Sequence, residues 1–175
     1  MSNYVQRFLL ENLDIRGAIV RLDSVWTSML AGRNYPQPVT RLLGEMSAVT
    51  LLMGENLKQT GRLTIQLNGN GPVSMLVIDC TDTLHIRGMA KHAENIAAQP
   101  VSELLGHGQL LITLDMPSMR ECYQSIVPLD GNNIAEIFEH YFRQSEQLPS
   151  RLFLITTDTA IFGLLLQKLP NADLQ

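Results

Sequence analysis

Residues 39–57 read VTRLLGEMSAVTLLMGENL, and this stretch decides the fold. Its apolar side chains recur at intervals of three and four, which places one stripe on one face of a helix. The stripe consists of Val39, Leu42, Leu43, Met46, Val49, Leu52, Met53 and Leu57. Pro36 and Pro38 precede it and suit a helix start, because N–H groups in the first turn lack intrahelical partners anyway. We predict one long amphipathic helix, in which Gly44 and Gly54 each cost up to about 1 kcal/mol relative to alanine but permit close packing.

The chain before this helix predicts a strand and a short helix. Residues 15–22 alternate loosely between apolar and polar side chains, with Gly17 interrupting them, and this pattern favours extended structure. Asp23 and Ser24 then offer N-cap oxygens for a short helix that runs to Leu30.

After the long helix the apolar period changes from helical to alternating. Residues 63–67 alternate as a half-buried strand does. The sequence Asn-Gly-Asn-Gly-Pro at residues 68–72 is a dense turn signal. Two further strands are predicted at residues 73–79 and 84–89, and together these segments suggest an antiparallel meander.

The last third of the chain predicts a strand pair, a helix and a closing hairpin. The strand pair is expected at residues 110–114 and 123–129. An asparagine in the turn after it can cap a helix that begins near Ile134 and is ended by Leu148-Pro149. The hairpin is expected at residues 151–157 and 161–169.

No long linker, low-complexity stretch or clear internal repeat interrupts this series. The economical interpretation is a single domain over residues 1–175. Its fold class is α+β, with antiparallel β-sheets packed against the long amphipathic helix and shorter helices.

The charge and hydrophobicity of the sequence limit the kinds of molecule that this protein is expected to bind. Hydrophobic residues make up 45% of the chain and charged residues 17%, against a typical charged share of about 25%. The low charge fits either a large core or a surface that meets other proteins. Net charge is −4 and no basic run is present, so we expect no nucleic-acid partner. The chain shows neither a signal peptide nor an apolar run near the ~20 residues of a membrane span, so we expect a cytoplasmic protein without a membrane partner.

The sequence offers no recognisable catalytic constellation. The four histidines, His85, His92, His107 and His140, form no zinc-binding spacing on a helix. Glu136 and His140 are expected to form only a weak surface pair. A Gly-x-Ser-x-Gly motif is absent, and residues 69–72 fit a hairpin turn better than a phosphate loop. We therefore predict a protein that is not an enzyme, with no catalytic, cofactor-binding or metal-binding residue.

The two cysteines, Cys80 and Cys122, belong to no Cys-x-x-Cys pair. Thiols in a cytosolic protein usually stay reduced. We expect both to act as small hydrophobic side chains within strands.

A family resemblance emerges from five segments. Residues 141–151, YFRQSEQLPSR, closely resemble the Tyr-Phe-x-x-Ser-Glu-Gln-x-Pro-Thr segment of the heat shock protein 33 family. Residues 35–39 (YPQPV), 69–72 (GNGP), 87–90 (RGMA) and 164–170 (LLLQKLP) are similar to other family motifs, in the same order. The matches extend over nearly the whole chain.

The resemblance implies an ATP-independent holdase of the bacterial cytosol. Such a chaperone binds unfolding client proteins under heat and oxidative stress and prevents their aggregation. It implies a C-terminal redox switch domain in which four cysteines bind zinc when reduced and form disulfide bonds when oxidised, releasing the metal. Neither Cys80 nor Cys122 falls at a family zinc position, so this chain is expected to be the N-terminal domain alone, without a cofactor and with its apolar surface constitutively exposed.

The resemblance has two local departures. Ser125 stands where the family usually has glycine, and residues 159–163 replace a longer glycine-rich hairpin tip.

The resemblance also implies a homodimer, for which domain swapping is a low-cost route. A non-catalytic dimerisation or scaffold module with one defined partner is the alternative function. The stripe of Leu42, Met46, Val49 and Met53 is either a client-binding surface or part of the core, and we assign no site residue from it.

Overall fold

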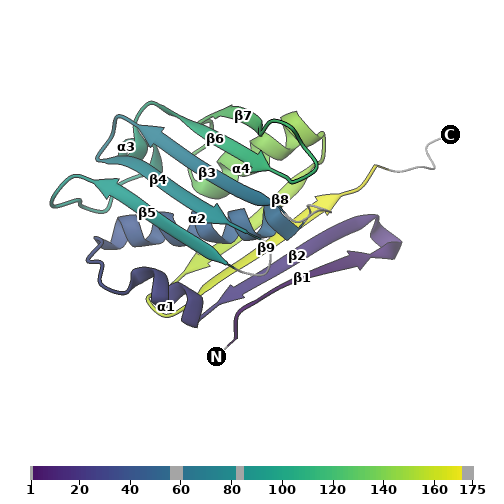
Figure 1. Ribbon diagram of the computed structural model, residues 1–175, viewed down its shortest axis with the longest axis horizontal. Helices are drawn as coiled ribbons and strands as arrows, with labels where there is room; N and C mark the ends of the chain where they lie inside the picture. Colours follow the sequence, from purple (N-terminus) through teal and green to yellow (C-terminus); the bar gives the residue numbers. More distant parts are fainter. Residues whose placement is uncertain (1, 56–60, 82–84, 171–175) are drawn as a thin grey trace.

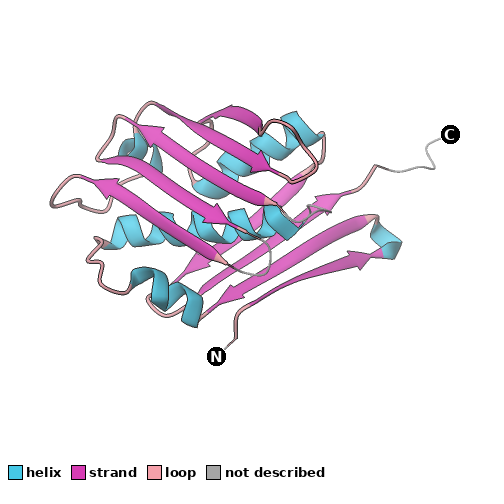
Figure 2. Ribbon diagram, viewed as in Figure 1, coloured by secondary structure: helices cyan, strands magenta, loops and turns pink. Residues whose placement is uncertain are grey.

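The computed structural model describes residues 2–55, 61–81 and 85–170, and its centre is one long helix, α2 (Gln37–Glu55). The helix lies between two antiparallel β-sheets (Figures 1 and 2). Every residue from Leu42 to Met53 is buried. The stripe of Leu42, Met46, Val49 and Met53 is therefore core and not a client-binding surface, with Met46 and Val49 wholly inaccessible.

The first sheet has four strands in the order β1-β2-β9-β8. It joins the two ends of the chain, because the N-terminal hairpin pairs with the C-terminal hairpin through β2 and β9. The strands are β1 (Tyr4–Leu10), β2 (Ile15–Leu22), β8 (Ser150–Thr156) and β9 (Ile161–Lys168). A short 3-10 turn, η1 (Glu11–Leu13), connects β1 to β2.

The second sheet has five strands in the order β5-β4-β3-β6-β7. They are β3 (Arg62–Gly69), β4 (Val73–Cys80), β5 (Ile86–His92), β6 (Gly108–Asp115) and β7 (Tyr123–Pro128). The meander prediction holds for the first three, whereas β6 crosses back to pair with the free side of β3. Leu84, where the third strand was predicted to start, lies outside the described residues, as does Leu57 of the long helix.

The remaining helices are α1 (Ser24–Leu30), α3 (Val101–Leu105), α4 (Ile134–Tyr141) and the π-helix η2 (Phe142–Glu146). Asn133 caps α4 as predicted, accepting from the Glu136 N–H at 2.9 Å. The cap predicted for α1 is wrong. The Asp23 carboxylate is occupied by Ser2 and Arg21. The oxygen of Asn3, from the start of the chain, accepts the Asp23 and Val25 N–H groups instead. The α+β prediction is confirmed.

Close backbone approach explains the Gly-Asn-Gly-Pro turn. The Gly71 N–H donates to the Leu105 carbonyl at 3.0 Å, so the turn packs directly on the end of α3. A Cβ at Gly69 or Gly71 would collide with backbone atoms of residues 104–106. Glycine is therefore required by space at this contact between the turn and α3.

The two glycines of α2 make a matched pair for measuring how tightly the sheets close on the helix. A Cβ at Gly44 would lie 2.5 Å from the Thr156 side chain, whereas one at Gly54 would meet nothing within 4 Å. We expect Gly44→Ala to lower the free energy of unfolding by about 1–3 kcal/mol through overpacking. Gly54→Ala should raise it by about 0.5–1 kcal/mol through helix propensity. Urea unfolding monitored by circular dichroism measures both, and equal effects of the two substitutions would contradict the sandwich geometry.

Candidate functional site

The outer face of the four-stranded sheet is apolar and open. Strand alternation turns Leu152, Leu165 and Val20 inward, where they are buried against α2. The residues between them point away from the helix, and two register rows cross the sheet. We call this set the outer apolar face; it consists of Ile19, Leu164 and Phe153 in one row and Phe162 and Ile155 in the next.

Exposure on this face is unusually high for such side chains. Phe153 is 56% and Ile155 60% accessible, and Phe162 and Ile19 also count among the exposed large hydrophobic residues. Contiguous exposed apolar patches are uncommon on monomers and mark surfaces that meet other molecules. In the described part of the chain no helix covers this side of the sheet (Figure 1). The face can therefore receive apolar groups from another protein without any rearrangement of the core.

Arg21 borders the outer apolar face. The Arg21 guanidinium lies 5.3 Å from the centre of the Phe162 ring and donates to Asp23 at 3.1 Å. Its hydrogen bond to Asp23 raises the pKa of Arg21. A guanidinium stacked on an aromatic ring keeps that ring oriented, so Arg21 helps to hold the Phe162 side chain in place.

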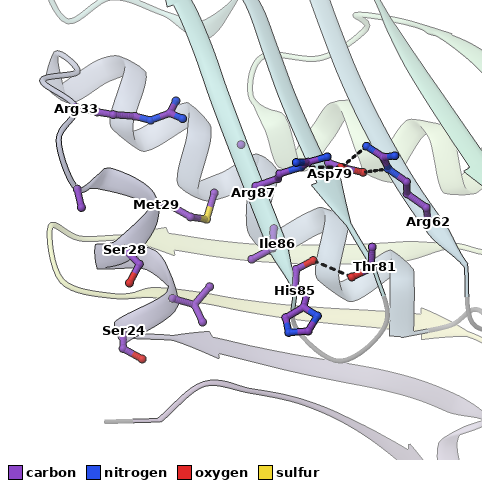
Figure 3. A pocket seen from close by; sticks show the side chains of 13 residues that line it. Ser24, Ser28, Met29, Arg33, Arg62, Asp79, Thr81, His85, Ile86 and Arg87 are labelled. Carbon is purple, nitrogen blue, oxygen red and sulfur yellow. Dashed lines mark hydrogen bonds and ion pairs between the residues drawn. The ribbon is translucent and has the colours of Figure 1, made fainter.

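The outer face of the five-stranded sheet is more polar near β3 and β4, although Met89 and Ile126 are exposed on β5 and β7. Arg62 holds Asp79 with two charge-assisted bonds of 2.7 and 2.6 Å, and Arg87 adds a third of 3.0 Å (Figure 3). Thr64 also donates to this carboxylate, at 3.1 Å. The bond from Arg62, followed by those from Arg87 and Thr64, lowers the pKa of Asp79 despite its partial burial. Asp79 therefore stays ionised with both oxygens occupied, which suits a structural tie across β3, β4 and β5 rather than proton transfer.

A cavity of about 740 Å³ adjoins this ion cluster, between α1 and the ends of β4 and β5. Met29, Val25 and Ile86 form its apolar wall, and Arg33 reaches in from the segment after α1 (Figure 3). Arg33 also donates to the Tyr35 hydroxyl, which in turn accepts the Ala90 N–H. The cavity thus combines arginines with one ionised carboxylate that already neutralises part of their charge.

The structure places the four histidines on separate elements. His85 precedes β5, His92 ends it, His107 lies between α3 and β6, and His140 lies on α4. The predicted Glu136–His140 pair is not formed: His140 Nδ1 lies 2.8 Å from the Asp130 carbonyl oxygen, and Glu136 accepts from the Asn132 N–H. Among residues 2–55, 61–81 and 85–170, no three His, Cys, Asp or Glu side chains gather as a metal site would require.

The two cysteines have different environments. Cys80 is buried at the end of β4, in agreement with the prediction that it fills space in a strand. Cys122 is exposed in the segment before β7, so the same prediction is wrong for this residue. Hydrophobicity alone suggested a buried strand position, but the loop between β6 and β7 carries Cys122 to the surface.

The Asp79 ion cluster yields a prediction with a defined pH dependence. Because the folded-state pKa of Asp79 is lowered, its stabilising effect is present above the unfolded pKa of about 3.9 and is lost as the pH falls through the folded value. We expect Asp79→Asn to lower the free energy of unfolding by about 1–3 kcal/mol at neutral pH. The deficit should shrink at pH 3. Urea unfolding at both pH values measures this, with Asp158→Asn, at an exposed turn residue, as the control. A deficit that is equal at both pH values would contradict it.

Within the described residues, no helix is both long and apolar enough to span a bilayer.

Comparison with known proteins identifies the family. The family model described as "Hsp33 protein" matches residues 3–175. The 33 kDa chaperonin of Ectopseudomonas mendocina is 43% identical over 172 residues, covering 97% of this chain and 58% of that protein. The 33 kDa chaperonin of Pseudoalteromonas translucida is 41% identical over 173 residues, covering 97% of this chain and 61% of that protein.

A solved structure agrees with these relatives. The crystal structure of the 33 kDa chaperonin from Thermotoga maritima superposes with a TM-score of 0.79 at 25% identity, covering 94% of this chain and 60% of that one. The chain thus spans about three fifths of the length of the curated relatives it matches. The match over residues 3–175, together with the shared fold, shows that this chain belongs to the heat shock protein 33 family, whose curated members are named 33 kDa chaperonins.

Proposed function

We propose that this chain is the client-binding domain of an ATP-independent holdase, which binds unfolding proteins in the cytoplasm and prevents their aggregation under heat and oxidative stress. The observation that carries the proposal is the outer apolar face, which no helix of the described residues covers, on a chain whose relatives are named chaperonins. A holdase needs exposed apolar area and no positioned catalytic groups. Phe153 and Ile155 supply such area on the edge strand β8, beside Leu164 and Phe162 of β9.

The four-stranded sheet is a better candidate for this role than the five-stranded one. On the outer side of β3, Thr64, Gln66 and Asn68 alternate with buried Leu63, Ile65 and Leu67, and the Asp79 ion cluster lies beside them. Desolvating such polar groups opposes the binding of an apolar segment. The outer apolar face lacks this penalty over most of its area.

Regulation by zinc and oxidation is proposed to reside in sequence C-terminal to this segment. The residues described here do not fit a zinc site, since Cys80 is buried with its thiol 3.1 Å from the Thr81 carbonyl, and Cys122 is exposed elsewhere. Zinc sites in proteins need several convergent thiolate or imidazole ligands. We therefore assign no metal ligand to this chain, and expect its client binding to be independent of zinc and of the redox state.

Aggregation of a chemically unfolded test protein, followed by light scattering without ATP and under reducing conditions, tests the proposal. The chain should suppress scattering near stoichiometric ratios. Ile155→Ser should weaken client binding by about three- to tenfold, through lost apolar contact. Ile126→Ser is the matched control, because Ile126 is equally exposed, at 66% against 60%, but lies on the other sheet, and it should leave suppression unchanged.

Three outcomes would contradict this assignment. Failure of a folded sample to suppress scattering would remove the holdase proposal. Binding of one partner at fixed stoichiometry, with indifference to unrelated unfolded proteins, would favour a scaffold module. Equal loss in the two isoleucine variants would remove the outer apolar face as the site.

We also propose that the chain forms a homodimer, with exchanged elements as one route. Static light scattering at tens of micromolar should then give twice the 19.6 kDa mass of one chain. A mass that stays at one chain over this range would contradict the dimer, and it would leave the aggregation assay to decide the holdase proposal independently.

A further inference from the structure

Strand β1 leaves one whole edge of its sheet unpaired. All seven of its residues are in register with β2, from Tyr4 opposite Arg21 to Leu10 opposite Ile15. In the described part of the chain no strand lies on its other side, and Figure 1 shows β1 at the margin of the molecule. Since backbone groups of a strand point alternately to its two edges, every second N–H and C=O of β1 is directed away from the sheet.

This edge also lacks the devices that normally protect an edge strand. Lysine, proline, bulges and short length all discourage strand addition. β1 has no lysine, proline or glycine and runs without a register shift. Its one charged residue, Arg7, is bound to Glu55 at 3.4 Å.

The two edges of the other sheet are less open. On β5 the Ala90 N–H already donates to the Tyr35 hydroxyl at 3.2 Å, and α1 packs beside that strand. The β7 edge is six residues long and ends in Pro128, which has no N–H to offer. Accessible pairing groups are therefore more continuous along β1 than along β5 or β7.

The charge of the four-stranded sheet indicates which kind of strand could pair with the free edge of β1. The four strands of this sheet contain five basic residues and no Asp or Glu, although the whole chain has a net charge of −4. The basic residues are Arg7, Arg16, Arg21, Arg151 and Lys168. A second copy pairing antiparallel about the middle of β1 would place Arg7 opposite Arg7, and like charges in that position repel. A neutral or acidic strand would not be repelled by Arg7 in this way.

We propose that β1 binds an extended, neutral or acidic apolar segment of an unfolded client as an added strand of the sheet. The inference rests on the proposed holdase function and specifies how the client is held. Main-chain hydrogen bonds are available in every sequence, so strand addition suits unrelated clients. Tyr4, Leu9 and Leu10 are exposed along the same strand and offer apolar contacts on both of its sides. The added strand would also extend the outer apolar face at its β1 margin.

The test uses a short soluble peptide that alternates valine and threonine and ends in glutamates. Its binding to the whole chain is followed by fluorescence anisotropy. The same peptide N-methylated along its centre keeps the side chains but loses the N–H donors, and it should bind at least about tenfold more weakly. A version that ends in lysines should also bind more weakly at low salt. Hydrogen exchange should show new protection at alternate amides of β1 when the first peptide is bound.

A proline pair supplies the matched variants. Leu9→Pro removes an N–H that faces the free edge of β1 and should abolish peptide binding, whereas Gln124→Pro makes the same change on the exposed edge strand β7 and should not. A thermal melt checks that both variants fold, and if Leu9→Pro does not, the N-methylated peptide and the exchange data still decide.

Several results would overturn the inference. They are equal binding of the two peptides, protection confined to β8 and β9, or no peptide binding by a chain that suppresses aggregation. Protection of β1 that rises with protein concentration in the absence of peptide would show that a second copy occupies the edge. Each leaves the holdase proposal standing, because that proposal fails only if the chain does not suppress aggregation.

Discussion

Burial of α2 between two sheets is the constraint on which the rest of the structure depends. A helix covered on both sides must be apolar or small around its whole circumference, and its few polar groups need partners within the helix. Ser47 and Thr50 satisfy this by donating to the carbonyl groups one turn earlier, at Leu43 and Met46, both at 2.7 Å. Glu45, near the start of the buried span, accepts from Arg41 at 3.2 Å. Burial nevertheless raises the pKa of Glu45, since desolvation outweighs that bond.

Because both sheets place their inner faces on α2, each has an outer face that the core does not use. The two outer faces then differ in chemistry. The five-stranded sheet carries ionic and hydrogen-bonding groups centred on Asp79, while the four-stranded sheet carries Phe153, Ile155 and their neighbours. The core thus carries one outer face with an ion cluster and scattered exposed apolar side chains such as Ile126, and another on which exposed apolar side chains lie in adjacent register rows. That asymmetry is the physical basis for assigning client binding to the four-stranded sheet.

The sequence predicts local elements well and their assembly poorly. Alternation at residues 63–67 and helical spacing at 39–53 identify β3 and α2, because each pattern is set by the geometry of a single element. Periodicity could not show that α2 is buried on both sides, since the apolar stripe of Leu42 and Met46 looks alike in a helix with one covered face. Nor could it pair β2 with β9 or β6 with β3, which depends on contacts between distant segments. The outer apolar face and the open β1 edge arise from that assembly, so no local pattern identifies them.

The longest of the segments that carry the family resemblance, residues 141–151, stabilises this assembly. Residues 142–146 form the π-helix η2, with Phe142 buried, and Gln147 adopts a left-handed conformation with φ 56°. The chain then turns so that Glu146 and Ser150 both accept from the Gln167 side chain of β9, at 3.4 and 3.2 Å. Gln167 accepts in turn from Arg16 of β2 at 3.0 Å. This cluster joins three of the four strands at one register position, and register decides which side chains face outward. A one-residue slip there would turn Phe153 and Ile155 inward and bury the surface on which the proposed function depends.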